Sequence, residues 1–110
     1  MEGFSEDWQN LGLDDDDLWV VQLAIMARPT GGPVIQGTGG LRKLRYKPPK
    51  GSGIKKAVRV CYVYFKEFSI ALLVIAYAKD EMDNISTEQK KACRELIRRQ
   101  AAVFAKRAIK

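Results

Sequence analysis

Two short stretches in the middle of the chain most constrain its fold, because each alternates basic or polar residues with apolar ones. They are LRKLRY (residues 41–46) and VRVCYV (residues 58–63), separated by a loop rich in proline and glycine. A period of two is typical of β-strands and sends successive side chains to opposite faces of a sheet. Lys43 and Arg45 therefore share one face, and Arg59 joins them if the strands pair in a suitable register. This pattern predicts a cationic sheet surface suited to a phosphate-bearing partner.

Two helices are expected before these strands. The first is a short turn capped by Ser5 and ended by Gly12. The acidic run at residues 14–17 then begins a second helix, where the acids cap the helix and complement its dipole. A metal site is the alternative for this run, but it lacks the glycine and ligand spacing of a calcium loop. The apolar stripe of the second helix is expected to contain Leu18, Val21 or Gln22, and Ile25, widened by Trp19 and Leu23, and the helix to end at Arg28-Pro29.

Three strands and a final helix follow. The strands are predicted at residues 41–46, 57–65 and 69–78, and the short link at residues 66–68 implies antiparallel neighbours. The third strand is apolar almost throughout, which is typical of a strand covered on both faces. A capping box at residues 86–89 begins a helix that runs to about Ala108, with an apolar stripe that includes Cys93 and Phe104.

The order of these elements predicts an α+β fold in which N-terminal helices pack on a small antiparallel sheet and a C-terminal helix completes the layer. The chain has 110 residues, a normal size for one domain. It shows no internal repeat and no boundary that would divide it. We therefore expect a single domain over residues 1–110.

The charge is divided unevenly along the chain. Residues 1–27 contain seven acids and no base, residues 28–66 contain ten bases and no acid, and residues 67–110 contain nine bases and six acids, which gives the net charge of +6. A solvated basic face is the commoner reason for a charge run. The absence of any acid over the 39 central residues favours a polyanion-binding surface instead.

The residue types that are missing exclude several kinds of chemistry. The chain has no histidine, which excludes histidine acid–base catalysis, serine–histidine or cysteine–histidine nucleophiles and histidine-ligated metals. Cys61 and Cys93 lie in apolar patterns and are expected to be buried free thiols, as in a reducing cytosol. The polar N-terminus does not resemble a secretory signal, and the apolar run at residues 70–78 is too short to cross a bilayer. We expect a cytoplasmic protein with no membrane association, no cofactor and no metal.

Several motifs, taken together, resemble the HigB-like branch of the RelE superfamily of bacterial toxins. They are GGPVIQGTGGLRKLR (residues 31–45), RVCY (residues 59–62), AYAKDE (residues 76–81) and the IS dipeptide at residues 85–86 that begins the last helix. The resemblance extends over roughly residues 13–98. It implies a small RelE-like fold and a type II toxin–antitoxin system in the bacterial cytoplasm. The implied activity is that of an mRNA interferase, an endoribonuclease that in many relatives acts on the translating ribosome. The implied partner is a cognate antitoxin, often a helix-turn-helix DNA-binding protein.

RNA cleavage without histidine or metal can proceed by attack of the ribose 2′-hydroxyl on the adjacent phosphate. Arg59 is the candidate for stabilising the phosphoryl charge, since a guanidinium is always protonated and binds two oxygens at once. Lys43 is the candidate base, because a lysine among like charges releases its proton more readily. Lys79 or Arg45 is expected to steady or protonate the leaving group, and Tyr77 to stack on a base or donate a hydrogen bond.

Other basic residues are candidates for contacts to the RNA backbone or the ribosome. They are Arg42, Lys47, Lys50, Lys55 and Lys56, together with the basic side of the last helix. The alternative for Arg42, Lys43 and Arg45 is an exposed sheet face that only keeps the protein soluble. For Tyr77 and Tyr62, core packing is an equal alternative.

Two other functions stay open at this point. The first is a catalytically degenerate member of the superfamily that binds antitoxin or RNA without cutting. It is favoured by the absence of the first strand of many relatives and by Lys55-Lys56-Ala57-Val58 in place of their glycines. The second is a ParE-like gyrase inhibitor, although a protein target does not require a phosphate-directed cluster of cations.

Overall fold

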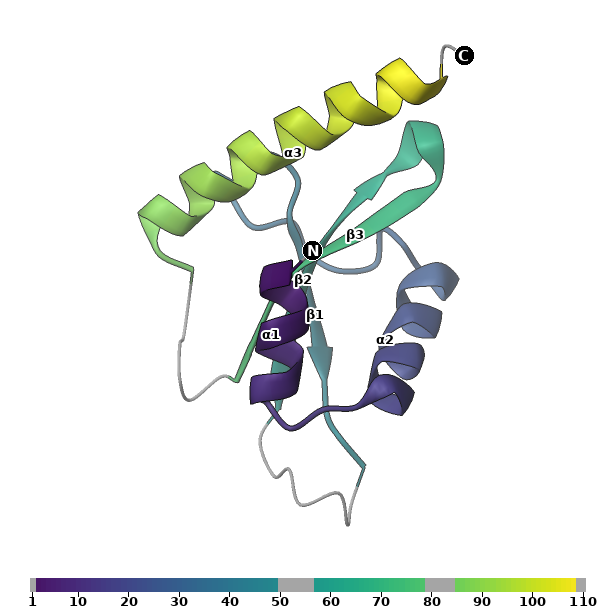
Figure 1. The fold of residues 1–110 in the computed structure, drawn as a ribbon, viewed down its shortest axis with the longest axis vertical. Helices are drawn as coiled ribbons and strands as arrows, with labels where there is room; N and C mark the ends of the chain where they lie inside the picture. The colour runs from purple at the N-terminus through teal and green to yellow at the C-terminus, as the bar shows by residue number, and fades with distance from the viewer. Residues whose placement is uncertain (1, 50–56, 79–84, 109–110) are drawn as a thin grey trace.

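The computed structural model describes residues 2–49, 57–78 and 85–108 and has the α+β architecture that the sequence predicts. Three antiparallel strands form one sheet in the order β1-β2-β3. In Figure 1, α3 crosses one end of the molecule, and α1 and α2 lie beside the other end of the sheet. The elements are α1 (Glu2–Asn10), α2 (Asp15–Ala27), β1 (Arg42–Tyr46), β2 (Val58–Phe65), the 3-10 turn η1 (Lys66–Phe68), β3 (Ile70–Ala78) and α3 (Thr87–Ala108).

The first helix begins earlier than the sequence predicts. It starts at Glu2, so Ser5 lies inside the helix and the prediction that Ser5 caps it is wrong. The reason is tertiary, because Phe4 and Trp8 on consecutive turns are both buried in the core. Gly12 ends the helix as expected: it has a positive φ of 79°, and its N–H bonds the Gln9 carbonyl at 2.9 Å.

The start of α2 confirms the capping prediction. The Asp14 side chain accepts a hydrogen bond from the Asp17 N–H at 2.9 Å, and the Asp17 carboxylate accepts one from the Asp14 N–H at 3.0 Å. Such a reciprocal pair satisfies two backbone donors that the first turn of a helix leaves free. Asp14 and Asp17 of the acidic run therefore cap the helix, as the sequence predicts.

The apolar stripe of α2 is narrower than predicted. Val21 and Ile25 are buried, whereas Trp19 and Leu23 are 60% and 45% exposed, so the prediction that these two widen the buried stripe is wrong. A sheet of three strands accepts only one face of this helix. The remaining apolar residues of α2 consequently face outwards.

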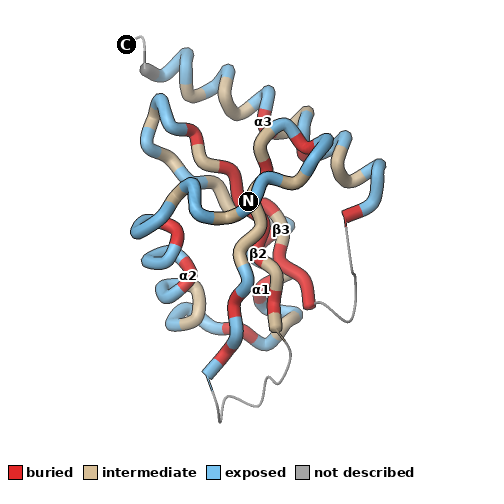
Figure 2. Tube along the Cα trace, turned by 180° about the vertical axis from the view of Figure 1, so that it is seen from behind, coloured by how far each residue is buried: buried red, intermediate tan, exposed pale blue. Residues whose placement is uncertain are grey.

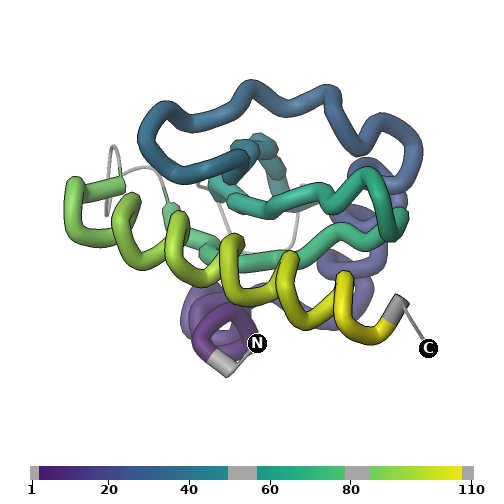
Figure 3. The backbone as a smooth tube through the Cα atoms, turned by 90° about the horizontal axis from the view of Figure 1, so that it is seen from above, coloured from purple at the N-terminus to yellow at the C-terminus, as the bar shows by residue number. Residues whose placement is uncertain are grey.

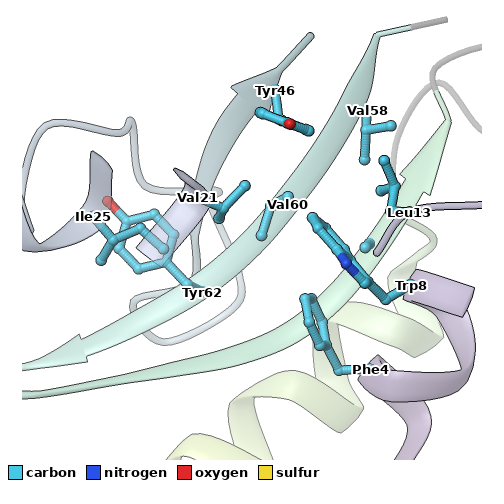
Figure 4. Close-up of a cluster of buried hydrophobic side chains, with 10 residues drawn as sticks. Phe4, Trp8, Leu13, Val21, Ile25, Tyr46, Val58, Val60 and Tyr62 are labelled. Carbon is cyan, nitrogen blue, oxygen red and sulfur yellow. The ribbon is translucent and has the colours of Figure 1, made fainter. Parts of the chain in front are cut away.

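The strand β2 lies at the centre of the sheet and separates two apolar clusters. Figure 4 shows the first cluster, in which Phe4, Trp8, Val21 and other helix residues pack on Val60 and its neighbours. The second cluster joins the opposite side chains of β2 and β3 to α3. Its members include Leu41, Cys61, Val63, Phe65, Val74, Tyr77, Ile85, Cys93 and Ile97. Figure 2 shows the buried positions following the strands.

The third strand is only partly covered. Val74, Ala76, Tyr77 and Ala78 are buried, but Ala71 is exposed, so the expectation of cover on both faces holds only for the second half of β3. The reason is topology, because β2 is the central strand and β3 lies at one side of the described sheet. A β-bulge between the pairs Cys61–Ile75 and Tyr62–Leu73 bends the strand at its midpoint.

The last helix confirms the capping box and the stripe. The Ser86 hydroxyl and the Gln89 N–H pair at 3.1 Å, and the Ser86 N–H donates to the Gln89 side chain at 2.9 Å. Figure 3 shows α3 running along the hairpin of β2 and β3. At the tip of this hairpin, the Phe104 ring packs edge-on against Phe65 with centroids 5.2 Å apart. Among the described residues, no helix combines the length and the apolar character that crossing a membrane requires.

Candidate functional site

The strand register brings the predicted cations together. Arg45 of β1 lies directly opposite Arg59 of β2, and Arg59 lies opposite Tyr77 of β3. Residues paired across antiparallel strands project from the same face of a sheet. Lys43 lies opposite Cys61, two residues along on this same face. The two strands therefore pair in the register that places Arg59 beside the cations of β1, and Lys43, Arg45 and Arg59 share one face.

These cations line an open cavity of about 560 Å³ beside the edge of β1. Its walls come from α2, from the turn that follows it, and from β1 and β2. The lining contains four cationic side chains and no acidic one among the described residues: Ala24, Arg28, Gly31, Gly32, Pro33, Lys43, Leu44, Arg45 and Arg59. A concave site with one sign of charge concentrates the opposite charge, so the cavity suits an anion.

The Arg59 guanidinium is partly buried at the wall of this cavity. Its Nη1 atom is buried and has no hydrogen-bond partner in the described part of the chain. A buried N–H without a partner costs about 1–3 kcal/mol. Like charges directly opposite in a sheet add roughly 0.2–1 kcal/mol, and the Arg45–Arg59 pair is of this kind. A bound anion would offset the repulsion between Arg45 and Arg59.

Arg42 occupies a different position from the other predicted cations. Alternation places it on the face opposite Lys43, and its Nη1 donates hydrogen bonds to the carbonyls of Thr30 (3.1 Å) and Gly32 (2.7 Å). Its guanidinium is thus used to hold the turn at the cavity wall. The structure does not bring it together with the cluster of Lys43, Arg45 and Arg59.

Tyr62 and Tyr77, for which the sequence left RNA contact and core packing as equal alternatives, are both buried. Tyr62 is 1% exposed, and its hydroxyl donates to the Pro29 carbonyl at 2.9 Å. Tyr77 is 5% exposed, so its ring is not available for stacking on a base. Burial and the neighbouring Cys61 raise the pKa of Tyr77, while Arg59 lowers it, and the phenol stays protonated at neutral pH.

The thiols confirm the prediction of free buried cysteines. Burial, with a contribution from Cys93, raises the pKa of Cys61 to about 12, although Lys43 and Tyr77 act in the opposite direction. Burial also raises the pKa of Cys93. A thiol that stays protonated at neutral pH is a poor nucleophile, so both act as core residues.

Several predicted contacts lie beyond the site or beyond the described residues. Lys47 follows β1 and is exposed. Lys79, the candidate for the leaving group, lies outside the described residues. The same holds for the proposed RNA contacts Lys50, Lys55 and Lys56.

The basic side of α3 is partly neutralised within the helix itself. Arg98 and Arg99 both donate to the Glu95 carboxylate, and these hydrogen bonds lower the pKa of Glu95 to about 2. Arg94, in contrast, lies against Gly39 of the loop before β1. The helix therefore carries less free positive charge than its sequence suggests.

Arg28 is a lining residue that the sequence did not single out. Sequence reasoning assigned it only to the end of α2, although two signals were present: it begins the block without acids and precedes the Gly31-Gly32 pair. No known protein-family model matches this chain. The site therefore has to be interpreted from its own geometry.

Proposed function

We propose that the protein is an mRNA interferase of the HigB-like branch of the RelE superfamily. It would cleave single-stranded RNA, in the ribosomal context suggested by that resemblance. The observation that carries the proposal is the Arg45–Arg59 pair beside Lys43 in a cavity whose described lining contains no acid. A phosphodiester supplies the negative charge that this cluster lacks.

The chemistry that fits these residues is attack of a ribose 2′-hydroxyl on the neighbouring phosphorus, with loss of the 5′ oxygen. Arg59 has the role of binding the two non-bridging oxygens, where negative charge accumulates in the transition state. Burial of Nη1 holds the guanidinium in place beside the cavity. A donor that is already desolvated and fixed needs little reorganisation, which makes its contribution large.

The attacking and leaving oxygens are assigned to Lys43 and Arg45 of β1. Lys43 takes the proton of the 2′-hydroxyl in this mechanism, and its half-buried position beside the cavity gives it access. Arg45 is exposed and stabilises the leaving 5′ oxygen by donating a hydrogen bond, and that oxygen takes its proton from solvent water. Lys79 keeps its candidacy for the same role from the sequence, whereas the buried Tyr77 is assigned only to packing.

The test is cleavage of messenger RNA on translating ribosomes by purified wild-type protein and variants. Arg59→Ala and Lys43→Ala are each expected to slow cleavage by roughly 100-fold or more, the usual cost of losing a charge-stabilising donor or a base. Lys66→Ala is the matched control, since Lys66 is exposed in η1 at the far end of the hairpin and does not line the cavity. If both cavity variants cut as fast as the control, the proposed active site is wrong.

A second candidate is a protein that binds RNA or an antitoxin without cutting. Two observations favour it: burial removes Tyr77 as a proton donor, and the cavity lining has only cations among its described ionisable residues. Wild-type protein that binds RNA but leaves the message intact would establish this candidate. Expression with and without a neighbouring antitoxin gene provides the matching test in cells, because only a cutting toxin arrests growth with message loss.

A further inference from the structure

Arg28 reaches the cavity from a different part of the fold than the other three cations. It forms the C-terminal cap of α2, where its N–H bonds the Ala24 carbonyl at 3.3 Å. Lys43, Arg45 and Arg59 come from the sheet. Positive charge therefore lines two walls of the cavity that belong to separate elements.

The turn that carries Arg28 into the cavity is fixed along its length by hydrogen bonds to its carbonyls. The Tyr62 hydroxyl donates to Pro29, Arg42 donates to Thr30 and Gly32, and the Lys43 N–H donates to Pro33 at 3.1 Å. The Gly31 N–H completes the turn by donating to the Arg28 carbonyl at 3.0 Å. Arg42 and Tyr62, whose side chains are directed at this turn, are thus positioning residues for the cavity wall.

The two glycines of the turn keep this wall close to the sheet. A Cβ at position 32 would lie 2.7 Å from the Lys43 carbonyl oxygen, so only glycine allows the turn to pack there. A Cβ at position 31 would lie 3.1 Å from the Arg28 Cβ and 3.4 Å from its Nε. The Arg28 side chain therefore packs across Gly31 at the cavity wall.

Charge decides what kind of ligand such a cavity takes. One phosphodiester carries a single negative charge, and one arginine can bind both of its free oxygens. The three arginines on two walls, Arg28, Arg45 and Arg59, already exceed what one phosphodiester neutralises. A strand with successive phosphates supplies more than one negative charge.

Building on the proposed function, we propose that Arg28 binds a backbone phosphate adjacent to the one held by Arg59. The cavity then recognises at least two successive phosphates of a single RNA strand. Arg28 sets this minimum length of RNA, and the turn at residues 29–33 holds Arg28 in place.

The test measures binding of RNA that lacks the attacking hydroxyl because every ribose is 2′-O-methylated. Wild-type protein is expected to bind a trinucleotide with two phosphodiesters roughly three- to tenfold more tightly than a dinucleotide with one. Arg28→Gln loses this preference, and Arg28→Lys retains part of it. On a longer single strand, Arg28→Gln also lowers the slope of log affinity against log salt by about 0.7, the value for one lost phosphate contact.

Controls separate this inference from the proposed function. Lys66→Gln removes an exposed charge away from the cavity and is expected to leave both the length preference and the salt slope unchanged. Thermal unfolding of Arg28→Gln checks that the fold is intact. If Arg59→Gln weakens RNA binding while Arg28→Gln keeps the wild-type length preference and salt slope, the role of Arg28 is refuted and the active site stands. If neither variant affects binding of RNA, both proposals fail.

Discussion

Replacing Arg59 by methionine is expected to make the protein more stable and to slow the proposed RNA cleavage strongly. Methionine keeps an unbranched side chain as far as the position of the arginine Nε, so the packing along the aliphatic stem is largely retained. The substitution removes the buried Nη1, which has no partner in the described part of the chain, and the repulsion from Arg45 directly opposite. Both changes favour the folded state.

The size of the gain follows from these two interactions. Removing a buried donor without a partner contributes about 1–3 kcal/mol, and removing a directly opposed like charge contributes roughly 0.2–1 kcal/mol. A net gain of about 2 kcal/mol corresponds to a rise of roughly 8 °C in melting temperature for a chain of this size. Loss of the donor to the transition state slows cleavage by roughly 100- to 1000-fold.

Thermal unfolding followed by circular dichroism measures the first effect, in a buffer free of phosphate and sulfate. Adding phosphate is expected to raise the melting temperature of the wild type, because a ligand that binds only the folded state stabilises it. The same addition leaves Arg59→Met unchanged. Lys66→Met serves as a control, with no change in melting temperature or in cleavage.

A lower melting temperature for Arg59→Met would refute the reasoning, since it would mean that the guanidinium contributes more to the apo fold than it costs. If phosphate raises the melting temperature of Arg59→Met as much as that of the wild type, the anion binds elsewhere.

Two further variants test the hydrogen bond between Tyr46 and Asp17 and the packing of the turn at the cavity wall. Tyr46→Phe removes the hydroxyl that donates to the Asp17 carboxylate at 2.5 Å and is expected to destabilise the protein by about 1–2 kcal/mol, measured by denaturant unfolding. Burial raises the pKa of Asp17, but hydrogen bonds from Tyr46 and Asp14 outweigh it and lower this pKa below 3.8. The stabilisation from the ionised Asp17 is therefore complete above pH 3.8 and is lost as the pH falls through the folded-state pKa. Tyr46→Phe is expected to flatten the acid side of the profile of stability against pH. Gly32→Ala places a Cβ 2.7 Å from the Lys43 carbonyl and is expected to cost about 1–3 kcal/mol and to weaken RNA binding, whereas wild-type stability and affinity would show that the turn moves freely.

Local signals were sufficient for most element boundaries. The capping boxes at Asp14 and Ser86 lie within four residues of the backbone groups they satisfy, so short-range chemistry determines where those helices begin. The start of α1 could not be predicted in this way. It depends on Phe4 and Trp8 packing against side chains that come much later in the chain.

The candidate site was predicted in part for the same reason. Alternation places Lys43 and Arg45 on one face whatever the rest of the chain does. Alternation cannot show that Arg42, the next residue, bonds the carbonyls of Thr30 and Gly32, because this depends on how the turn returns to β1.

Residue types and local periodicity were enough to predict the α+β order, the cationic character of the middle block and the absence of histidine chemistry. Only the tertiary structure decided that Arg59 lies opposite Arg45, because register is a property of two paired strands. Only the tertiary structure brought Arg28 to the same cavity as Arg59, 31 positions further along the chain. The physical reason is that a cluster of like charges is unfavourable locally and persists only where packing of the surrounding elements holds it in place.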